Sequence, residues 1–332
     1  MNNMFDPIGS AGASPIDWLS EDIPWDGDTI TMPGIYRDIP IEEYHGNVDL
    51  LDAPSISKSG LKNLLPIHGG SPKRFWKLWS YNPDHVTPKQ TDALKFGKAA
   101  HALLLGDEVF EDKFAIRPEV YTDWSTKAAK KWRETMEKLG RTVITAEDFE
   151  LIRAMRADAE QNEMVKAGIF QGRIERSMFW KDPETGIWIR TRPDNIPAAA
   201  SIFADLKTTA DFDEEFLRRQ MFDSDLFIQA AMTRMVCRGL NIPFESFVLV
   251  YVLKDKDNLT DTCHVEISEE DIDRGELLVR WCLDTISGCL KSGEWPGARP
   301  FDDGTTHLNM TPWQKARIDN FLIKSGLKEG QS

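Results

Sequence analysis

The chain has 332 residues, of which 41% are hydrophobic and 28% are charged, and its formal net charge at pH 7 is −14. This length allows one large domain or two smaller ones. No run of eighteen apolar residues is present, so we expect no membrane span. The N-terminus shows no basic region followed by an apolar stretch, so we expect no secretory signal either.

Much of the negative charge lies in residues 1–52, which hold eleven acidic residues and one basic residue, Arg37. The segment is rich in Asp, Pro, Gly and Asn, which predicts a largely irregular acidic arm ahead of a domain over residues 53–332. Three alternatives stay open. The arm is a disordered tail, or an extended segment that packs through Trp18, Trp25 and Tyr36, or a mimic of DNA charge that contacts a partner.

Two short helices are expected next. Residues 55–65 form the first, with Ser55 or Ser57 as N-cap, and Ser71-Pro72 opens the second. Lys73 and Arg74 on the second helix are candidates for phosphate contact. The alternative is an amphipathic helix with a solvated basic face.

Residues 93–105 show the apolar stripe of an amphipathic helix, and His101 lies on it. Taken alone, such a histidine is more often a core residue than a ligand. Helices over residues 126–140 and 146–168 follow and resemble an insertion before the core. The first of these two helices is basic in its first half, so its lysines are either phosphate contacts or a solvated face.

The most informative stretch runs from residue 174 to residue 207. Residues 174–180 and 187–194 read as two strands around a turn at 181–186, and residues 201–207 form a third strand. Asp205 and Lys207 are two apart, so on a strand they share a face. Carboxylates suit Mg²⁺, and a lysine beside them offsets charge on a phosphate. The alternative is a solvated hairpin with surface charges.

The rest of the chain reads as alternating helices and strands. Helices are expected over residues 212–220, 222–238, 269–290 (capped by Ser268) and from Thr311 to about Ile323, and strands over 246–254 and 262–267. No Walker lysine loop is present, so ATP-driven translocation is not expected. The four cysteines, Cys237, Cys263, Cys282 and Cys289, show no C-x-x-C spacing and are expected to be reduced thiols.

Asp194, ten residues and then Asp205-Leu206-Lys207 resemble the core motif of the PD-(D/E)xK nucleases. The wider text, E-R-S-x-x-W, G-x-W-x-R-x-R-P-D, D-L-K-T-T and Q-A-A-M, resembles the RecE-type (exodeoxyribonuclease VIII) branch of phages and prophages, from about Ser55 to Trp313. The resemblance implies an α/β, restriction-endonuclease-like fold with a central mixed sheet flanked by helices. It divides the domain into a helical part (53–170), a catalytic core (171–267) and C-terminal helices (268–325).

The resemblance also implies roles for single residues. Asp194 and Asp205, joined by His101 and the Leu206 carbonyl, would bind Mg²⁺, for which Mn²⁺ can substitute. Lys207 would orient the attacking water, and Glu175, one strand away, would bind metal through water or hold Lys207. Substrate contacts are expected from Gln229, Arg192, Thr208, Lys73 and Arg74. The family motif Q-x-x-x-Y has tyrosine where this chain has Thr233, and threonine cannot stack on a base.

The activity that the resemblance implies is a Mg²⁺-dependent, double-strand-dependent 5′→3′ exodeoxyribonuclease of phage-type recombination, in the cytoplasm of a bacterial host. It would act on double-stranded DNA ends beside a single-strand annealing protein, and the family forms toroidal homo-oligomers. Two alternatives remain, a catalytically degenerate DNA-binding or assembly protein and a structure-specific endonuclease. Cas4-type nucleases carry an iron–sulfur cluster that needs a cysteine ahead of the core; none precedes Cys237, so no cluster is expected.

Overall fold

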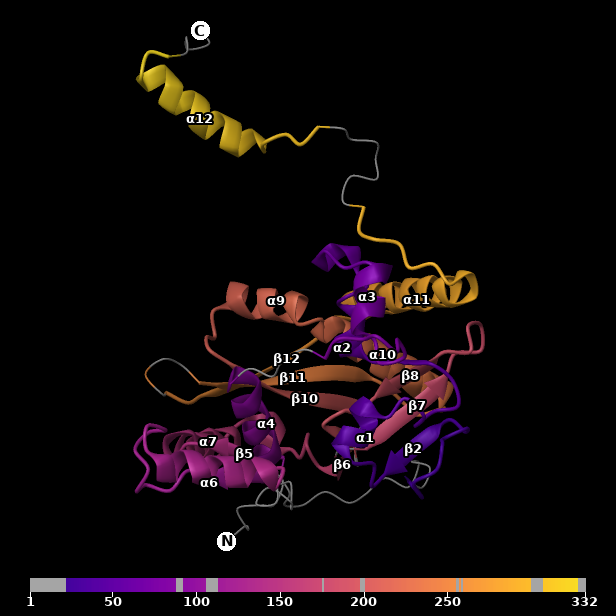
Figure 1. Cartoon of the computed structure of the whole chain (residues 1–332), viewed down its shortest axis with the longest axis vertical. Coiled ribbons are helices and arrows are strands. Elements are labelled where there is room, and N and C mark those ends of the chain that lie inside the picture. The colour runs from indigo at the N-terminus through magenta and orange to yellow at the C-terminus, as the bar shows by residue number, and fades with distance from the viewer. Residues whose placement is uncertain are drawn as a thin grey trace.

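The computed structural model describes residues 22–87, 92–105, 113–174, 176–197, 201–254, 257, 259–299 and 307–327 (Figure 1). They form an α/β fold in which mixed sheets are covered by helices. The expected fold class is therefore confirmed.

A three-stranded sheet lies at the centre. Its strands are β10 (Ile202–Thr209), β11 (Ser246–Leu253) and β12 (Thr262–Glu266), with β10 parallel to β11 and β12 antiparallel. Helices α4 (Asp92–Leu104) and α7 (Ala146–Ala159) cover one face, and α10 (Leu226–Gly239) covers the other. Because both of its faces are buried, the middle strand β11 is nearly all apolar. Among the described residues β10 is an outer strand of this sheet, opposite β12.

A five-stranded sheet adjoins it in the order β1-β2-β7-β8-β3. The hairpin of β7 (Ser177–Lys181) and β8 (Trp188–Thr191) matches the predicted pair of strands around a turn. Strands β1 (Ile23–Pro24) and β2 (Gly34–Arg37) extend one edge, and β3 (Ser55–Ile56) pairs with β8 at the other. One sheet thus combines strands from the predicted arm, the predicted helical part and the predicted core.

The alternative of a disordered tail is wrong for residues 22–52. Besides β1 and β2 they form helix α1 (Ile41–Gly46), and they bury apolar side chains against β7 and β8. The buried side chains are Ile30, Ile35, Tyr36, Ile39, Tyr44, Leu50 and Leu51. These apolar residues are separated by acidic residues that stay in solvent, so average composition conceals the packing. The alternative of a packed segment therefore holds for residues 22–52, whereas Trp18 lies outside the described residues.

The first predicted helix is also shorter than expected. Ser55 and Ile56 pair with β8 as β3, and only α2 (Lys58–Leu61) is helical, followed by a 3₁₀ turn, η1 (Pro66–His68). Helix α3 (Pro72–Leu78) begins as predicted, because the Ser71 hydroxyl accepts a hydrogen bond from the Arg74 amide.

The expected insertion contains β4 (Phe114–Ile116), α6 (Lys127–Lys138) and β5 (Thr142–Ile144) before α7. The single helix predicted over residues 146–168 is divided in two. Helix α7 ends at Ala159, and Asn162 then caps a separate short helix, α8 (Glu163–Lys166). Strands β6 (Gly172–Ile174) and β9 (Asn195–Pro197) pair antiparallel and lead into the site.

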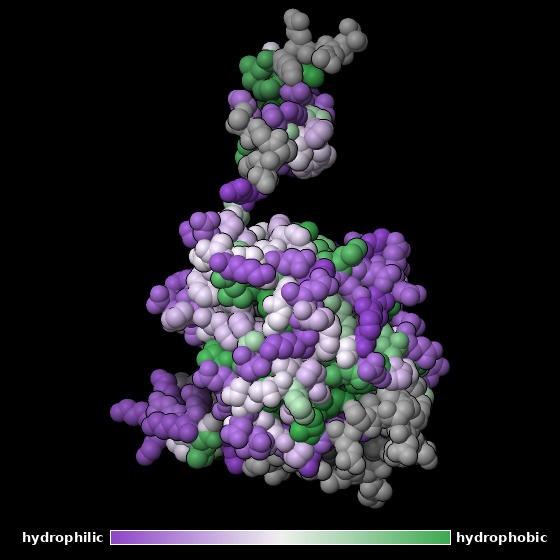
Figure 2. Space-filling view, turned by 90° about the vertical axis from the view of Figure 1, so that its right-hand side faces the viewer, coloured by the Kyte–Doolittle hydropathy of each residue, from purple (hydrophilic) through white to green (hydrophobic). Residues whose placement is uncertain are grey.

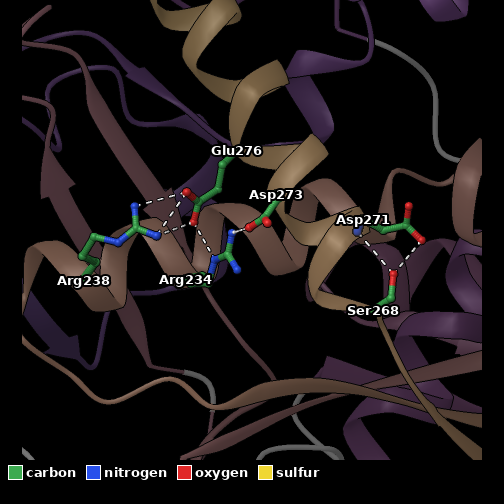
Figure 3. A network of polar contacts seen from close by, with 6 residues as sticks. All are labelled: Arg234, Arg238, Ser268, Asp271, Asp273 and Glu276. Carbon is green, nitrogen blue, oxygen red and sulfur yellow. Dashed lines mark hydrogen bonds and ion pairs between the residues drawn. The ribbon is translucent and has the colours of Figure 1, made fainter.

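The C-terminal helices differ in their surroundings. Helix α9 spans Glu214–Asp223, and the next helix, α10, packs on α11 (Glu269–Ser292). Glu276 of α11 forms ion pairs with both Arg234 and Arg238 of α10 (Figure 3). Ser268 caps α11 as predicted. Helix α12 (Pro312–Lys324), by contrast, lies away from the body with apolar side chains on its surface, Trp313 being 67% exposed (Figures 1 and 2).

Two further findings concern composition. The four cysteines are free, and three of them are buried. Among the described residues, no helix has both the length and the apolar character needed to cross a membrane.

Candidate active site

The predicted acid–lysine pair lies on β10. Because side chains alternate along a strand, Asp205 and Lys207 point to the face covered by α10, and the Lys207 ammonium forms an ion pair with Asp205 Oδ2. Asp205 is 1% exposed. Its Oδ1 accepts a hydrogen bond of 2.5 Å from the Gln229 amide on α10. No well-directed hydrogen bond reaches Asp205 Oδ2, so its interaction with Lys207 is an ion pair.

The second carboxylate reaches the site from the loop after β8. Asp194 Oδ2 accepts a hydrogen bond of 2.6 Å from the Leu206 amide, on the open edge of β10. Its Oδ1 lies 2.7 Å from Nε2 of His101 near the end of α4. The Leu206 carbonyl faces the same side, since the Lys207 ammonium is 3.5 Å from it. The site thus straddles a strand edge, with α4 on one side and α10 on the other.

The two buried carboxylates shift each other's pKa values. Burial raises the pKa of Asp205, and the neighbouring Asp194 reinforces this against the attraction of Lys207. Burial also opposes the charge of Asp194, but His101 and Lys207 outweigh it, so the pKa of Asp194 lies below its usual value. Burial would lower the pKa of Lys207, yet Asp205 and Asp194 hold it above the usual value. At Asp205, burial and the second carboxylate thus outweigh the attraction of Lys207.

A cavity of about 230 Å³ opens onto Asp194 and His101. It is lined by residues of α1, α2, β8 and α10, among them Tyr44, His45, Lys58, Arg190, Arg192 and Gln229. Burial and the adjacent Lys207 lower the pKa of Lys58 to about 8, although Asp205 and Asp225 partly offset them. Burial and the Arg190 guanidinium lower the pKa of His45 to about 4, so this imidazole is neutral at pH 7.

These donors suit a hard divalent cation. Two carboxylates, an imidazole and a backbone carbonyl converge, and the buried Oδ2 of Asp205 is left without a directed hydrogen bond. In the described part of the chain, no three His, Cys, Asp or Glu residues are arranged so that they could hold a metal ion as they stand. Binding would therefore replace the contact of His101 with Asp194 and that of Lys207 with Asp205.

The structure gathers some of the other predicted residues and separates the rest. Arg192 lines the cavity, where its guanidinium donates to the Ile39 carbonyl and lies over the Tyr44 ring. Gln229 is present too, but it bonds Asp205. Thr208 does not line this cavity, and its side chain shares the strand face of Leu206, opposite Asp205 and Lys207, so its predicted substrate contact stays a prediction. Its carbonyl accepts a hydrogen bond from Gln220.

Lys73 and Arg74 lie elsewhere. They border a separate cavity of about 690 Å³ beside α3 and are not among the residues around Asp194. Glu175 falls outside the described residues, so its predicted role stays a prediction.

Thr233, in place of the family tyrosine, is a buried structural residue. Its hydroxyl donates to the Gln229 carbonyl at 2.9 Å and lies 3.1 Å from the Thr191 hydroxyl on β8. It therefore joins the helix that carries Gln229 to the strand that leads to Asp194.

Sequence reasoning missed Lys58, His45 and Tyr44. Lys58 follows Ser57 at the start of α2, and a single lysine there carries no recognisable spacing. Only the path of the chain brings it beside Lys207 and Asp205. Tyr44 lies in the segment predicted to be an arm, whereas in the structure it lines the cavity.

Comparison with known proteins agrees with this geometry. Residues 57–299 match the family described as a PDDEXK-like domain of unknown function, DUF3799. The chain belongs to this family. The match spans Lys58, His101, Asp194, Asp205, Lys207 and Gln229, and it supports a nuclease.

Two other comparisons add little. The fold is similar to that of a candidate exonuclease from Eubacterium rectale, with a TM-score of 0.49 and 13% identity over 79% of this chain and 92% of the other. This similarity carries no part of the functional argument. No curated protein matches the chain.

Proposed function

We propose that this PD-(D/E)xK-like protein is a metal-dependent DNA nuclease, and that it acts as a double-strand-dependent 5′→3′ exodeoxyribonuclease. One observation carries the proposal. Asp194, Asp205 and Lys207 meet at one strand edge with His101, and the same cavity is lined by Lys58 and Arg192. Carboxylates for a cation and separate cations for phosphate thus lie side by side, as phosphodiester hydrolysis requires.

Ile41, Tyr44 and His45 of α1 wall the cavity, whose volume is about 230 Å³. The preference for DNA ends over internal sites rests on the family resemblance, and a comparison of linear with circular duplex tests it.

Each group has a separate task in the proposed reaction. Asp194, Asp205, His101 and the Leu206 carbonyl would hold Mg²⁺ or Mn²⁺, which when bound polarises the phosphate and lowers the pKa of water. The Lys207 ammonium stabilises charge that develops on the scissile phosphate and orients the attacking water. Arg192 and Lys58 position the phosphate, and Gln229 keeps the Asp205 carboxylate in place.

The test is incubation of linear and covalently closed circular duplex with the purified protein and Mg²⁺, with EDTA as the control. We expect linear duplex to be degraded and the circle to stay closed. Opening of the circle would indicate a structure-specific endonuclease. No cleavage of either substrate in Mg²⁺ or Mn²⁺ would indicate a DNA-binding or assembly protein with an inactive nuclease fold.

Polarity and context belong to the same proposal. Duplexes labelled at one 5′ or one 3′ end give the direction, because a 5′→3′ enzyme releases the 5′ label first. A role in phage-type recombination, in the cytoplasm of a bacterial host, implies a single-strand annealing protein as partner. A toroidal homo-oligomer would keep the enzyme on its substrate, and sedimentation of the full chain measures the oligomeric state.

A further inference from the structure

Helix α6 carries a cluster of positive charge on a chain with net charge −14. Lys127, Lys130, Lys131 and Lys138 are exposed, and they line a surface groove of about 460 Å³ along the helix. Glu134 is the one acidic residue that lines this groove. The lysines repeat at helical spacing and extend over eleven residues, about 16 Å at a rise of about 1.5 Å per residue.

These lysines differ from other exposed cations of the molecule. Arg153, Arg218 and Arg274 each form an ion pair with a glutamate three or four residues away. No ion pair joins the four α6 lysines to any described residue, and the helix's own Glu137 is taken by Arg133. Within the described part of the chain, Glu134 therefore offsets only part of the positive charge of the groove.

The groove has the chemistry of a phosphate-binding surface. Lysine is a compact point charge that binds phosphate without a fixed geometry. No aromatic or large aliphatic side chain lines the groove, whereas protein interfaces usually contain such anchors. A polyanion with regularly spaced charges and few apolar contacts suits this surface better than an acidic protein does.

The position of α6 links the groove to the candidate active site. Helix α6 packs on β5, β5 packs on α4, and α4 carries His101 near its end. Two surfaces for one polyanion are thus joined by rigid elements. A long duplex extends beyond the active-site cavity, so the rest of it can contact other surfaces of the protein.

We propose that the lysine face of α6 is a second DNA-binding surface, which holds the phosphate backbone of the duplex away from the scissile bond. The inference rests on the proposed nuclease function, because that function supplies DNA as the polyanion. It adds the four α6 lysines, and their contribution to salt-dependent DNA binding, to what the active site requires. Long substrates contact both surfaces, and very short ones contact only the cavity.

The experiment compares two quadruple variants in an Asp205→Asn background, so that binding is measured without turnover. One replaces Lys127, Lys130, Lys131 and Lys138 with glutamine, which keeps helix propensity. The matched control also introduces glutamine, at four exposed cations outside α6: Arg153, Arg218, Arg274 and Lys291. Both lose four positive charges, and thermal melting checks that both fold. Binding of a blunt duplex of about 40 base pairs, ~140 Å long at about 3.4 Å per pair, is measured over a range of salt concentrations.

We expect the α6 variant to bind the duplex at least tenfold more weakly at about 0.1 M salt. The slope of log K against log salt should become less negative by about 3 to 4, because each of four lost phosphate contacts contributes about 0.9 to it. The control should keep the slope of the parent. A duplex of about 10 base pairs should bind the parent and the α6 variant alike.

Three results would overturn the inference: an unchanged slope in the α6 variant, an equal loss in the control, or competition by polyglutamate as strong as that by DNA of the same charge. The outcome is independent of catalysis. If the wild-type chain cleaves no DNA while the slope still depends on α6, the nuclease proposal fails and the DNA surface stands.

Discussion

Two buried pairs of opposite charge can be compared directly in this protein. Asp182, in the turn after β7, and Asp205, on β10, are each 1% exposed and each face a cation. The Asp182 carboxylate receives both terminal nitrogens of Arg280, at 2.8 and 2.9 Å, and also bonds Thr185. Asp205 forms an ion pair with Lys207 and accepts a hydrogen bond from Gln229, but a second carboxylate, Asp194, lies nearby.

The pKa values record the difference. Burial opposes the charge on Asp182, but the hydrogen bonds from Arg280 and Thr185 outweigh it, so the pKa of Asp182 lies below its usual value. For Asp205, burial and Asp194 prevail and the pKa is raised. The Asp182 carboxylate is thus paired by Arg280 and Thr185. At Asp205, Lys207 does not outweigh burial and the second carboxylate, and a pKa perturbed in this way is typical of functional sites.

The largest effect should come from Asp205→Asn. The substitution keeps the shape and removes one charge, so hydrolysis of linear duplex should fall more than about 10³-fold, because a charged ligand supplies several kcal/mol of transition-state stabilisation. The melting temperature should stay the same or rise, since repulsion with Asp194 disappears. Glu266→Gln, an exposed change on β12, is the matched control. Activity above a few per cent of wild type would mean that the site is misplaced.

Lys207→Ala should have the next largest effect. A fixed cation beside the scissile phosphate is worth roughly 3–4 kcal/mol, so the single-turnover rate should fall about 10²–10³-fold at saturating Mg²⁺. Lys207→Arg should rescue poorly, because a planar fork replaces a compact ammonium. Full activity of Lys207→Ala would reject the assignment of this strand.

Asp182→Asn tests the completed pair. Loss of one partner leaves the Arg280 charge partly buried, and we expect unfolding to become easier by about 2–3 kcal/mol at pH 7. Because the folded pKa of Asp182 lies below 3.8, its contribution is present above that pH and is lost as the pH falls through the folded value. The free energy of unfolding of the variant should therefore fall less than that of the wild type as the pH is lowered into the acid range.

The control for this comparison is Asp284→Asn, which removes the exposed partner of the same arginine. It should cost less than about 1 kcal/mol. Urea unfolding at several pH values measures both variants, and nuclease activity well below the melting temperature should be unchanged in each. Equal losses in the two variants would contradict the distinction drawn between the pairs.

The smallest effect is expected from His101→Ala. The His101 side chain is 26% exposed and contacts Asp194, so its removal should barely change the melting temperature. The Mg²⁺ concentration needed for half-maximal rate should rise about tenfold or more, whereas His264→Ala should leave it unchanged. A lower melting temperature with an unaltered Mg²⁺ requirement would make His101 a structural residue.

The sequence allowed the acid–lysine pair to be located because strand geometry is local. An apolar strand with a period of two places Asp205 and Lys207 on one face wherever the sheet lies. Most helix starts depend on similarly local signals, such as Ser268 and Thr311 as caps, whereas the fold class follows from the family resemblance. The roles of these site residues remain predictions.

Long-range packing could not be predicted in the same way. Residues 22–52 looked irregular because their apolar side chains are interspersed with acidic, Pro and Gly residues, and in the structure they pack on the surface offered by β7 and β8. Lys58 became part of the site through tertiary contact alone. For Thr208, the same alternation that locates Lys207 turns the side chain to the opposite face, which the family motif alone does not indicate.

The hydrogen bond from the Leu206 amide to Asp194 has a practical consequence. Unpaired strand edges readily recruit other chains and promote aggregation. Here the Asp194 carboxylate accepts the hydrogen bond of one edge amide, that of Leu206, as a neighbouring strand would. Asp194→Ala would therefore expose this amide as well as remove a ligand, so a loss of activity would have two causes. Asp205→Asn leaves the amide paired, and it is the variant to choose for crystals of a DNA complex.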